Sequence, residues 1–506
     1  MNKWYYIMSI VLLLGVCGCE KFLEESSQNE VRPGSVIDLE ELLMGEVYPV
    51  GTTFHNFLDL LTDDVDSRFS NPSESMSPFF VKRWGPVFTF QKDMYELLQY
   101  TGVMGTTGTR LDCYEHYFKR IKGCNVVLEM LDKVKGDDDA KANVRGQALA
   151  MRAWLYFMVV NLYGQPYNAN PNAPGVPLLT SSMVKDLWPP RASVAAIYAQ
   201  VEADLLEALP LIERYGQANN KYKVTDMFVY TFLSRMYLYM ENWEEAEKYA
   251  TKGIQKNPNL LNLANFVQAS APGSLTEHLY SLNSPEAIWW GYGTDDEFWA
   301  FDWPIALTML NKTGAYKVSS SLQGLYEYQN VVDDRKDMRY IYYYSTWNLW
   351  IDSNTGAVER PGHVSGNKKS TGTASTSAVK GMRVAELYLN RAEARIHLGK
   401  EAEARDDLNF LRRHRYDTRY VAYQHITHSG EALVQFCKDE RRRELSYEDH
   451  RWFDLRRYGM PEIRHTYQEE AGQSPQVYTL TQGDPRYVFA FPEYVLKRNP
   501  SLTQNP

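Results

Sequence analysis

Residues 230–258 read YTFLSRMYLYMENWEEAEKYATKGIQKNP, and they carry the clearest repeat signal in the chain. A helix-packing pattern of large and then small residues is formed by Tyr230, Leu233, Ser234, Tyr237, Ala246, Ala250 and Gly253. Small residues are needed where two helices approach closely, and Pro258 stops the second helix because proline lacks the backbone N–H of a helix interior. The stretch therefore predicts two helices that pack tightly as a hairpin.

This spacing is the tetratricopeptide pattern, and it returns in residues 384–415, VAELYLNRAEARIHLGKEAEARDDLNFLRRHR. The second copy is formed by Tyr388, Ala392, a helix-ending Gly399, Ala404, Leu408 and Leu411. One such hairpin cannot bury its apolar face alone, so the hairpins stack on neighbours. We predict a mainly α fold in which tetratricopeptide-like helical hairpins form a scaffold.

Three more helices are predicted upstream from apolar residues at helical spacing. The first covers residues 114–131, and the second covers 144–162 and stops near Gly164. The third begins after Ser193, a favourable N-cap, and presents its apolar stripe before Pro210.

The two repeats are separated by strand-like and loop-like sequence. A long irregular segment in a helical scaffold is where binding residues tend to lie. We divide the chain into a signal peptide (1–18), an N-terminal helical part with tetratricopeptide-like repeats (19–259), a loop-rich insertion that we expect to face ligand (260–382) and a C-terminal part (383–506).

The N-terminus carries an export signal. Residues 1–22 read MNKWYYIMSIVLLLGVCGCEKF, and the apolar stretch from Ile7 to Val16 is too short to span a membrane comfortably. A small residue followed by cysteine, here Gly18 and Cys19, is typical of bacterial lipoprotein precursors, whose cysteine is acylated. We predict a lipid anchor at Cys19, and the alternative is an ordinary secretory signal.

The composition excludes one class of partner and favours another. The chain of 506 residues has 54 Lys and Arg against 63 Asp and Glu, and this net charge of −9 lacks the basic footprint that phosphate contacts need. No nucleic-acid partner is expected. The 36 Tyr and 12 Trp exceed what packing normally demands, which makes carbohydrate or interface contacts one possible use of these rings.

Three segments together resemble the SusD/RagB family of outer-membrane nutrient-binding lipoproteins of the Bacteroides group. They are residues 384–415, residues 440–459 (ERRRELSYEDHRWFDLRRYG) and the end of the chain, residues 489–506 (FAFPEYVLKRNPSLTQNP). Residues 152–157 (RAWLYF) and 319–339 agree as well, so the resemblance runs nearly end to end. It implies a SusD-like α fold.

The charged residues of 440–459 alternate in sign at helical spacing. This pattern predicts an ion-paired seam between helices. The alternative, a basic patch for an anionic ligand, is disfavoured because carboxylates accompany nearly every arginine.

The resemblance implies a function without catalysis. A family member binds a glycan or similar nutrient at the cell surface and passes it to a SusC-like TonB-dependent outer-membrane transporter. The expected location is the outer membrane, with the protein anchored by lipid and facing the cell exterior.

Sugar binding requires an exposed aromatic ring beside polar hydrogen-bonding groups. In the N-terminal loops, Asp66, Arg68 and Trp84 are candidate ligand-binding residues, although Trp84 would serve equally as a core residue. In the insertion, DDEFWAFDWP places Trp299 and Trp303 among aspartates, and the alternative is a loop packed on the helices.

Other tryptophans of the insertion are assigned differently. Trp289 and Trp290 resemble the start of a buried strand and are predicted to be core. Trp347 and Trp350 remain open to either interpretation.

Two other functions compete. A tetratricopeptide-type scaffold would bind protein partners at the outer membrane through its concave face. A glycoside hydrolase would need a paired acid and base, and the sequence contains no nucleophile elbow, zinc helix or phosphate loop.

No cofactor or metal is predicted. Asp63, Asp64 and Asp66 could hold calcium, but an acidic loop is usually only solvated. The scattered cysteines of the mature chain form neither a disulfide framework nor a zinc ligand set.

Overall fold

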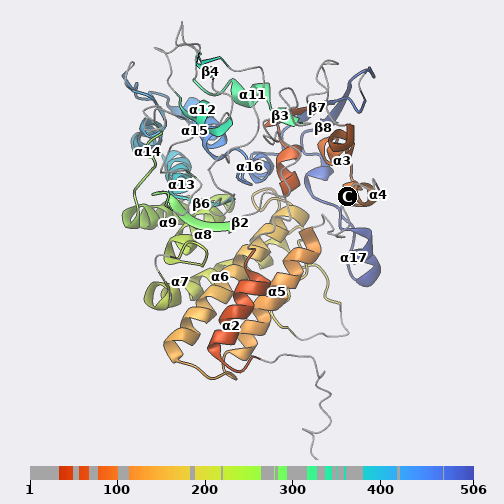
Figure 1. Ribbon diagram of the computed structural model, residues 1–506, viewed down its shortest axis with the longest axis vertical. Helices are drawn as coiled ribbons and strands as arrows, with labels where there is room; N and C mark the ends of the chain where they lie inside the picture. The colour runs from red at the N-terminus through yellow and green to blue at the C-terminus, as the bar shows by residue number, and fades with distance from the viewer. Residues whose placement is uncertain are drawn as a thin grey trace, which may run out of the picture.

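The computed structural model places most of the chain. It describes residues 33–49, 56–67, 78–100, 113–182, 188–217, 220–263, 279, 283–292, 316–327, 337–344, 350–351, 358–359, 380–418, 422–470 and 472–506. Within these ranges the architecture is mainly helical with short two-stranded sheets, as predicted (Figure 1). None of the described helices is both long and apolar enough to span a membrane.

Long helices form the lower half of the molecule as drawn in Figure 1. They are α2 (Val36–Leu42), continued by the π-helix η2 (Leu43–Val47), α5 (Cys113–Met130), α6 (Asp138–Tyr163) and α7 (Val194–Tyr215). Helix α6 starts at the N-cap Asp137, whose carboxylate accepts from the backbone N–H groups of Asp139 and Ala140. It is packed between α5 and α7 and is buried along most of its length.

Helix α7 extends beyond Pro210, before which the sequence placed its apolar stripe. The helix begins after the N-cap Ser193 as expected, but it continues through Pro210 to Tyr215. Proline removes the hydrogen bond to the carbonyl of Leu206, and the 43% exposure of that residue gives water access to this side of the helix. Leu209 and Ile212, on either side of the proline, are buried and hold the helix on its neighbours.

Both predicted hairpins are confirmed. The first is α8 (Asp226–Tyr239) with α9 (Trp243–Lys256), and the second is α13 (Val384–His397) with α14 (Glu401–Arg413). The two stack, since α13 packs against both α8 and α9.

The small residues of the pattern lie at the contacts between helices. Ala246 and Ala250 are fully buried, and a Cβ at Gly253 would lie 2.7 Å from the side chain of Leu387 in the next hairpin. Gly399, after the first helix of the second hairpin, has φ +74°, which favours glycine.

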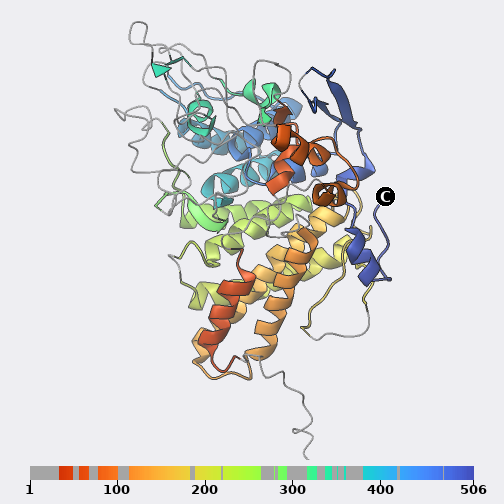
Figure 2. The ribbon, with the colours of Figure 1, turned by 45° about the vertical axis from the view of Figure 1, so that its right-hand side comes forward.

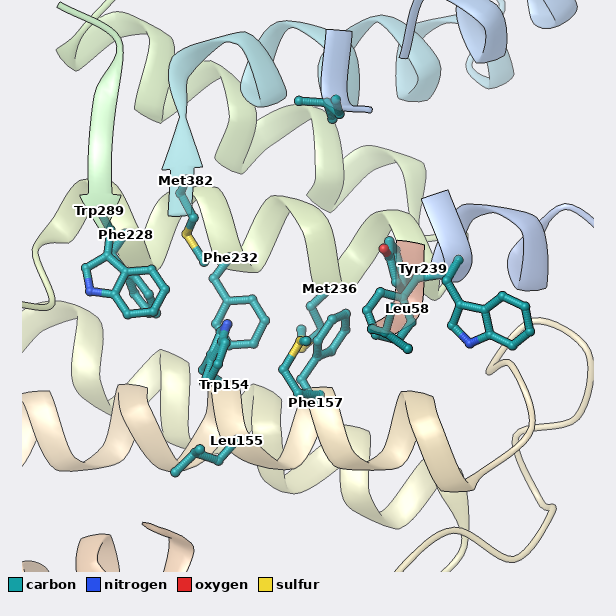
Figure 3. Close-up of a cluster of buried hydrophobic side chains, with 14 of the residues drawn as sticks. Leu58, Trp154, Leu155, Phe157, Phe228, Phe232, Met236, Tyr239, Trp289 and Met382 are labelled. Carbon is teal, nitrogen blue, oxygen red and sulfur yellow. The ribbon is translucent and has the colours of Figure 1, made fainter. Parts of the chain in front are cut away.

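The interface between the lower helices and the hairpins is a continuous apolar core (Figure 3). Aromatic rings dominate it: Trp154 of α6 meets Trp289 edge to face with ring centroids 5.6 Å apart, and Phe157 meets Phe232 of α8 at 5.2 Å. This core fixes the hairpins on α6.

The described parts of the insertion are short elements. They are β2 (Ala287–Tyr292), β3 (Tyr316–Val318), α11 (Ser320–Gln323), α12 (Arg339–Tyr344), β4 (Trp350–Ile351) and β5 (Val358–Glu359), and β6 (Lys380–Arg383) follows at the start of the C-terminal part. Strand β2 pairs antiparallel with β6. Trp289 and Trp290 are 1% and 2% exposed, so their prediction as core residues is confirmed.

Most of the remaining N- and C-terminal elements pack together in the upper half of the molecule, and the last helix lies lower, at the level of α5 (Figures 1 and 2). From the N-terminal part come η3 (Asn56–Leu61), β1 (Val65–Ser67), α3 (Pro78–Phe88) and α4 (Met94–Tyr100). The C-terminal part supplies α15 (Gly430–Leu445), α16 (Arg451–Arg457), β7 (Ile463–Tyr467), β8 (Gln476–Leu480), η6 (Pro485–Tyr487) and α17 (Glu493–Arg498). The end of the chain is fixed to α6, because Asn505 donates to the carbonyl of Tyr163 at 2.9 Å.

Candidate functional site

The two regions that contain the candidate ligand-binding residues meet at a small sheet. Strand β1 of the N-terminal part pairs antiparallel with β3 of the insertion, with Asp66 opposite Lys317. About 250 residues of sequence separate the two strands. The pairing therefore anchors one flank of the insertion beside the N-terminal candidates.

Asp66 forms a hydrogen bond that joins β1 to α11 of the insertion. Its side chain is partly exposed, and one carboxylate oxygen accepts from the backbone N–H of Ser320 at 3.0 Å. Ser319 caps α11 and also donates through its hydroxyl to the carbonyl of Asp63 at 2.7 Å. Asp66 thus joins β1 to the first turn of α11, and its second oxygen has no described partner.

Two arginines from the C-terminal part hold the neighbouring acidic residues. Arg451 binds Asp63 through two nitrogens, each at 2.8 Å, and Arg442 donates to Asp64 at 2.6 Å. Burial would raise the pKa of Asp63, but Arg451 and Arg442 outweigh it and lower that pKa to about 2.

These ion pairs argue against calcium at the acidic cluster. The carboxylates of Asp63 and Asp64 already face guanidinium groups, so a cation bound there would compete with Arg442 and Arg451. The same contacts connect the N-terminal part, the insertion and α15 at one place.

The placement of Trp84 on a loop was wrong. The residue lies in α3 and is 4% exposed within the main core cluster, which agrees with the alternative of a core residue. The adjacent Gly85 is also a helix residue, and Tyr467 of β7 packs closely at it. A buried indole cannot stack on a sugar in solution.

The other candidates lie outside the described residues: Cys19, Arg68, Trp299 and Trp303. Among the described tryptophans whose exposure is known, Trp188 is the one exposed by more than half, at 52%. The sequence analysis missed it, and the signal that could have drawn attention to it is the rigid Pro189–Pro190 pair that follows.

Three charged residues of α15, Glu440, Arg443 and Glu444, belong to a buried ion network, and ion pairing at this helix was predicted. We define this network by the residues Asp337, Glu286, Glu440, Glu444, Glu448, Arg339, Arg383, Arg412, Arg415 and Arg443. None of these side chains is more than 6% exposed. Arg412 also pairs at 2.7 Å with the carboxylate of Glu327, which is 48% exposed and connects the network to the surface.

The network has a structural role. Burial would raise the pKa of Glu440, but Arg339, Arg443 and Arg412 outweigh it and keep the pKa below its usual range. Arg339 comes from the insertion, so the network fixes α12 to α15. The alternative of a basic patch for an anionic ligand does not hold here, because every arginine of the network already has a carboxylate.

The described cysteines offer no reactive thiol. Cys113, Cys124 and Cys437 are buried and form no disulfide. Burial raises the pKa of the Cys124 and Cys437 thiols, which keeps them protonated and unreactive.

The stacked helical hairpins place the protein in the class of helical-repeat scaffolds. The β1–β3 pair and the buried ion network hold parts of the insertion on this scaffold. A family model described as "SusD family" matches residues 289–506, and one described as "Starch-binding associating with outer membrane" matches residues 21–238. The two matches together span most of the chain, which belongs to the SusD family. No curated protein matches the chain in sequence.

Solved structures from Bacteroides share the fold. A SusD superfamily protein from Bacteroides thetaiotaomicron has a TM-score of 0.66 at 20% identity, covering 93% of this chain and 100% of its own. A SusD-like carbohydrate binding protein from Bacteroides vulgatus has a TM-score of 0.63 at 22% identity, covering 93% and 97%. A SusD superfamily protein from Bacteroides fragilis has a TM-score of 0.63 at 19% identity, covering 93% and 99%. At these identities the likeness establishes the fold alone.

Proposed function

We propose that the protein binds a glycan at the outer membrane and delivers it to a SusC-like TonB-dependent transporter. The observation that carries this proposal is family membership over both halves of the chain, one half by a model described as starch-binding and associated with the outer membrane. One of the structures with the same fold is described as a carbohydrate binding protein.

The junction at Asp66 supports a binding role for the insertion. The β1–β3 pair and the Arg451–Asp63 contact hold one flank of the insertion against the C-terminal part. Because this flank is already held in place, the insertion loses less conformational entropy when it binds ligand. We assign Trp299 and Trp303 as stacking residues and Asp66 and Arg68 as polar ligand-binding groups.

The protein is proposed to act without catalysis and to be anchored by lipid at Cys19. A binding protein needs aromatic platforms and hydrogen-bonding groups but no paired acid and base. The anchor would keep the ligand-binding insertion at the membrane surface that holds the transporter.

Affinity gel electrophoresis tests binding and catalysis together. Purified protein from Glu20 onward is run in native gels that contain starch, a xylan, a mannan, a pectin or a mucin glycan. We expect slower migration in at least one gel, with no reducing sugar released from any polysaccharide. Unchanged migration in every gel would contradict glycan binding, and released sugar would contradict the absence of catalysis.

A further inference from the structure

A cleft of about 410 Å³ lies between α2, the first turns of α6 and the end of α7. Helix α2 is at the opposite end of the molecule from α11 and β4 of the insertion (Figures 1 and 2). The side chains that matter for the cleft are Ile37, Asp139, Asn143, Arg214, Tyr215 and Gln217. Its volume is within the usual range of small-molecule sites.

A buried amide in this cleft is held in one orientation by a chain of hydrogen bonds. The backbone N–H of Val224 can only donate, and it donates to the hydroxyl of Tyr48 at 2.9 Å. That hydroxyl therefore donates its own proton to Oε1 of Gln147 at 2.9 Å, so Nε2 of Gln147 donates to Oδ1 of Asn143 at 3.1 Å.

The chain of bonds leaves one donor unused. Asn143 is only 8% exposed, and its Nδ2 has no acceptor among the described residues. Because Oδ1 faces Gln147, Nδ2 is the polar atom that Asn143 offers to the cleft. Nδ2 is not one of the buried polar atoms that lack a partner, so solvent reaches it, and a ligand hydroxyl in the cleft could accept from it in place of water.

The other side chains of the cleft complement a sugar. Tyr215 is half-buried, and Ile37 is 62% exposed, so both offer apolar surface to the C–H face of a pyranose. Arg214, whose guanidinium lies 5.0 Å from the Tyr215 ring centroid, has no carboxylate partner among the described residues. It can donate to hydroxyl groups, and Asp139 and Gln217 can accept from them.

The charges of the cleft favour a neutral ligand. Asp139 and Arg214 have opposite signs, and the Glu40 carboxylate at the rim is paired with Lys223 at 2.6 Å. A cleft of mixed sign gives no net attraction to an anion or a cation.

We propose that this cleft is a second site for a neutral saccharide, separate from the insertion. The cleft would bind the same class of ligand, a saccharide, as the site in the proposed function. The two proposals have nothing else in common. A second site would let one molecule hold two positions of the same polysaccharide chain and so raise its avidity.

The test removes the insertion site first. In the double variant Trp299→Ala/Trp303→Ala, binding of neutral hexasaccharides of glucose, mannose, xylose and galactose is measured at millimolar concentration by saturation-transfer NMR. We expect at least one hexasaccharide to bind this double variant, and its affinity to fall at least fivefold when Tyr215→Ala is added.

Two further substitutions separate binding from folding. Asn143→Asp keeps the acceptor for Gln147 and removes the free donor, so we expect it to weaken binding at least threefold while thermal unfolding of the free protein shows a folded state. Tyr222→Ala, at a tyrosine 41% exposed outside the cleft, is the matched control and should leave the affinity unchanged.

The possible outcomes distinguish the two proposals. If the wild type binds and the double tryptophan variant binds none of the hexasaccharides, the cleft proposal is overturned and the proposed function stands. If binding is unaffected by the two tryptophan substitutions but is lost with Tyr215→Ala, the cleft stands and the role of the insertion falls. Binding that survives Tyr215→Ala unchanged would also overturn the cleft.

Discussion

Replacement of Glu444 by glutamine perturbs the centre of the buried ion network. The carboxylate accepts four hydrogen bonds: one from Arg339 at 3.1 Å, one from Arg383 at 3.0 Å and two from Arg415 at 3.0 Å. Glutamine has nearly the same shape but no charge, and its amide nitrogen would face guanidinium donors. The substitution therefore isolates the electrostatic contribution from packing.

The expected loss of stability is large because the centre of the network is closed to water. Glu444 and its three arginine partners are each 0% exposed at the side chain. Removing the charge of one partner of a buried ion pair typically costs about 3–5 kcal/mol, since the other partner is left as an uncompensated buried charge. We expect Glu444→Gln to lower the free energy of unfolding by about 4 kcal/mol.

Urea unfolding followed by tryptophan fluorescence and by circular dichroism measures this loss. Glu207→Gln is the matched control, because Glu207 pairs with Arg145 and both side chains are nearly half exposed. An exposed pair contributes about 0–1 kcal/mol, so the control should unfold close to the wild type. If Glu444→Gln unfolds within 1 kcal/mol of the control, the network does not hold the insertion as described.

Three further outcomes are expected. Burial would raise the pKa of Glu393, but Arg457 outweighs it and lowers the pKa from 4.5 to about 2. The resulting stabilisation of about 3 kcal/mol is present above pH 4.5 and is lost as the pH falls towards 2. Glu393→Gln should therefore flatten the pH dependence of the free energy of unfolding between pH 4.5 and 2, and an unchanged slope would refute the assignment. Gly381→Ala should cost more than about 3 kcal/mol in urea unfolding, because its Cβ would clash with the carbonyl oxygen of Trp289. Gly45→Ala, with open space around it, should be nearly neutral in the same assay. Cys19→Ala should move the protein from the membrane fraction to the soluble fraction, and its retention with the membranes would count against the lipid anchor.

The sequence was most informative where the signal is local. Helical spacing and small residues predicted both hairpins, because the two helices of a hairpin follow one another in the sequence: Ser234 of α8 donates to the carbonyl of Ala246 in α9 at 3.2 Å. The alternating charges of α15 likewise predicted ion pairing, although the partners of Glu444 come from three distant segments that no spacing rule identifies.

The errors arose where packing overrides a local preference. Pro210 is a helix-breaker by its own chemistry, but the burial of Leu209 and Ile212 keeps α7 intact around it. Trp84 next to a glycine resembled a loop platform because sequence alone cannot show that Tyr467 packs at that glycine.

Long-range features had no usable signal. The pairing of Asp66 with the insertion and the cleft beside Asn143 each combine segments that lie far apart in the chain. Their residues are ordinary polar residues in sequence, and only the fold brings them together. The domain boundaries and the roles of Arg68, Trp299 and Trp303 stay predictions.

The most direct test of the account is the affinity of Trp299→Ala/Trp303→Ala for the polysaccharide that the gels identify, measured by isothermal titration calorimetry. Two stacking rings contribute about 1 kcal/mol each, so the affinity should fall at least about tenfold. Trp188→Ala, at an exposed tryptophan outside the insertion, is the control and should bind as the wild type does. An unchanged affinity of the double variant would contradict the claim that the insertion presents the aromatic surface to the glycan.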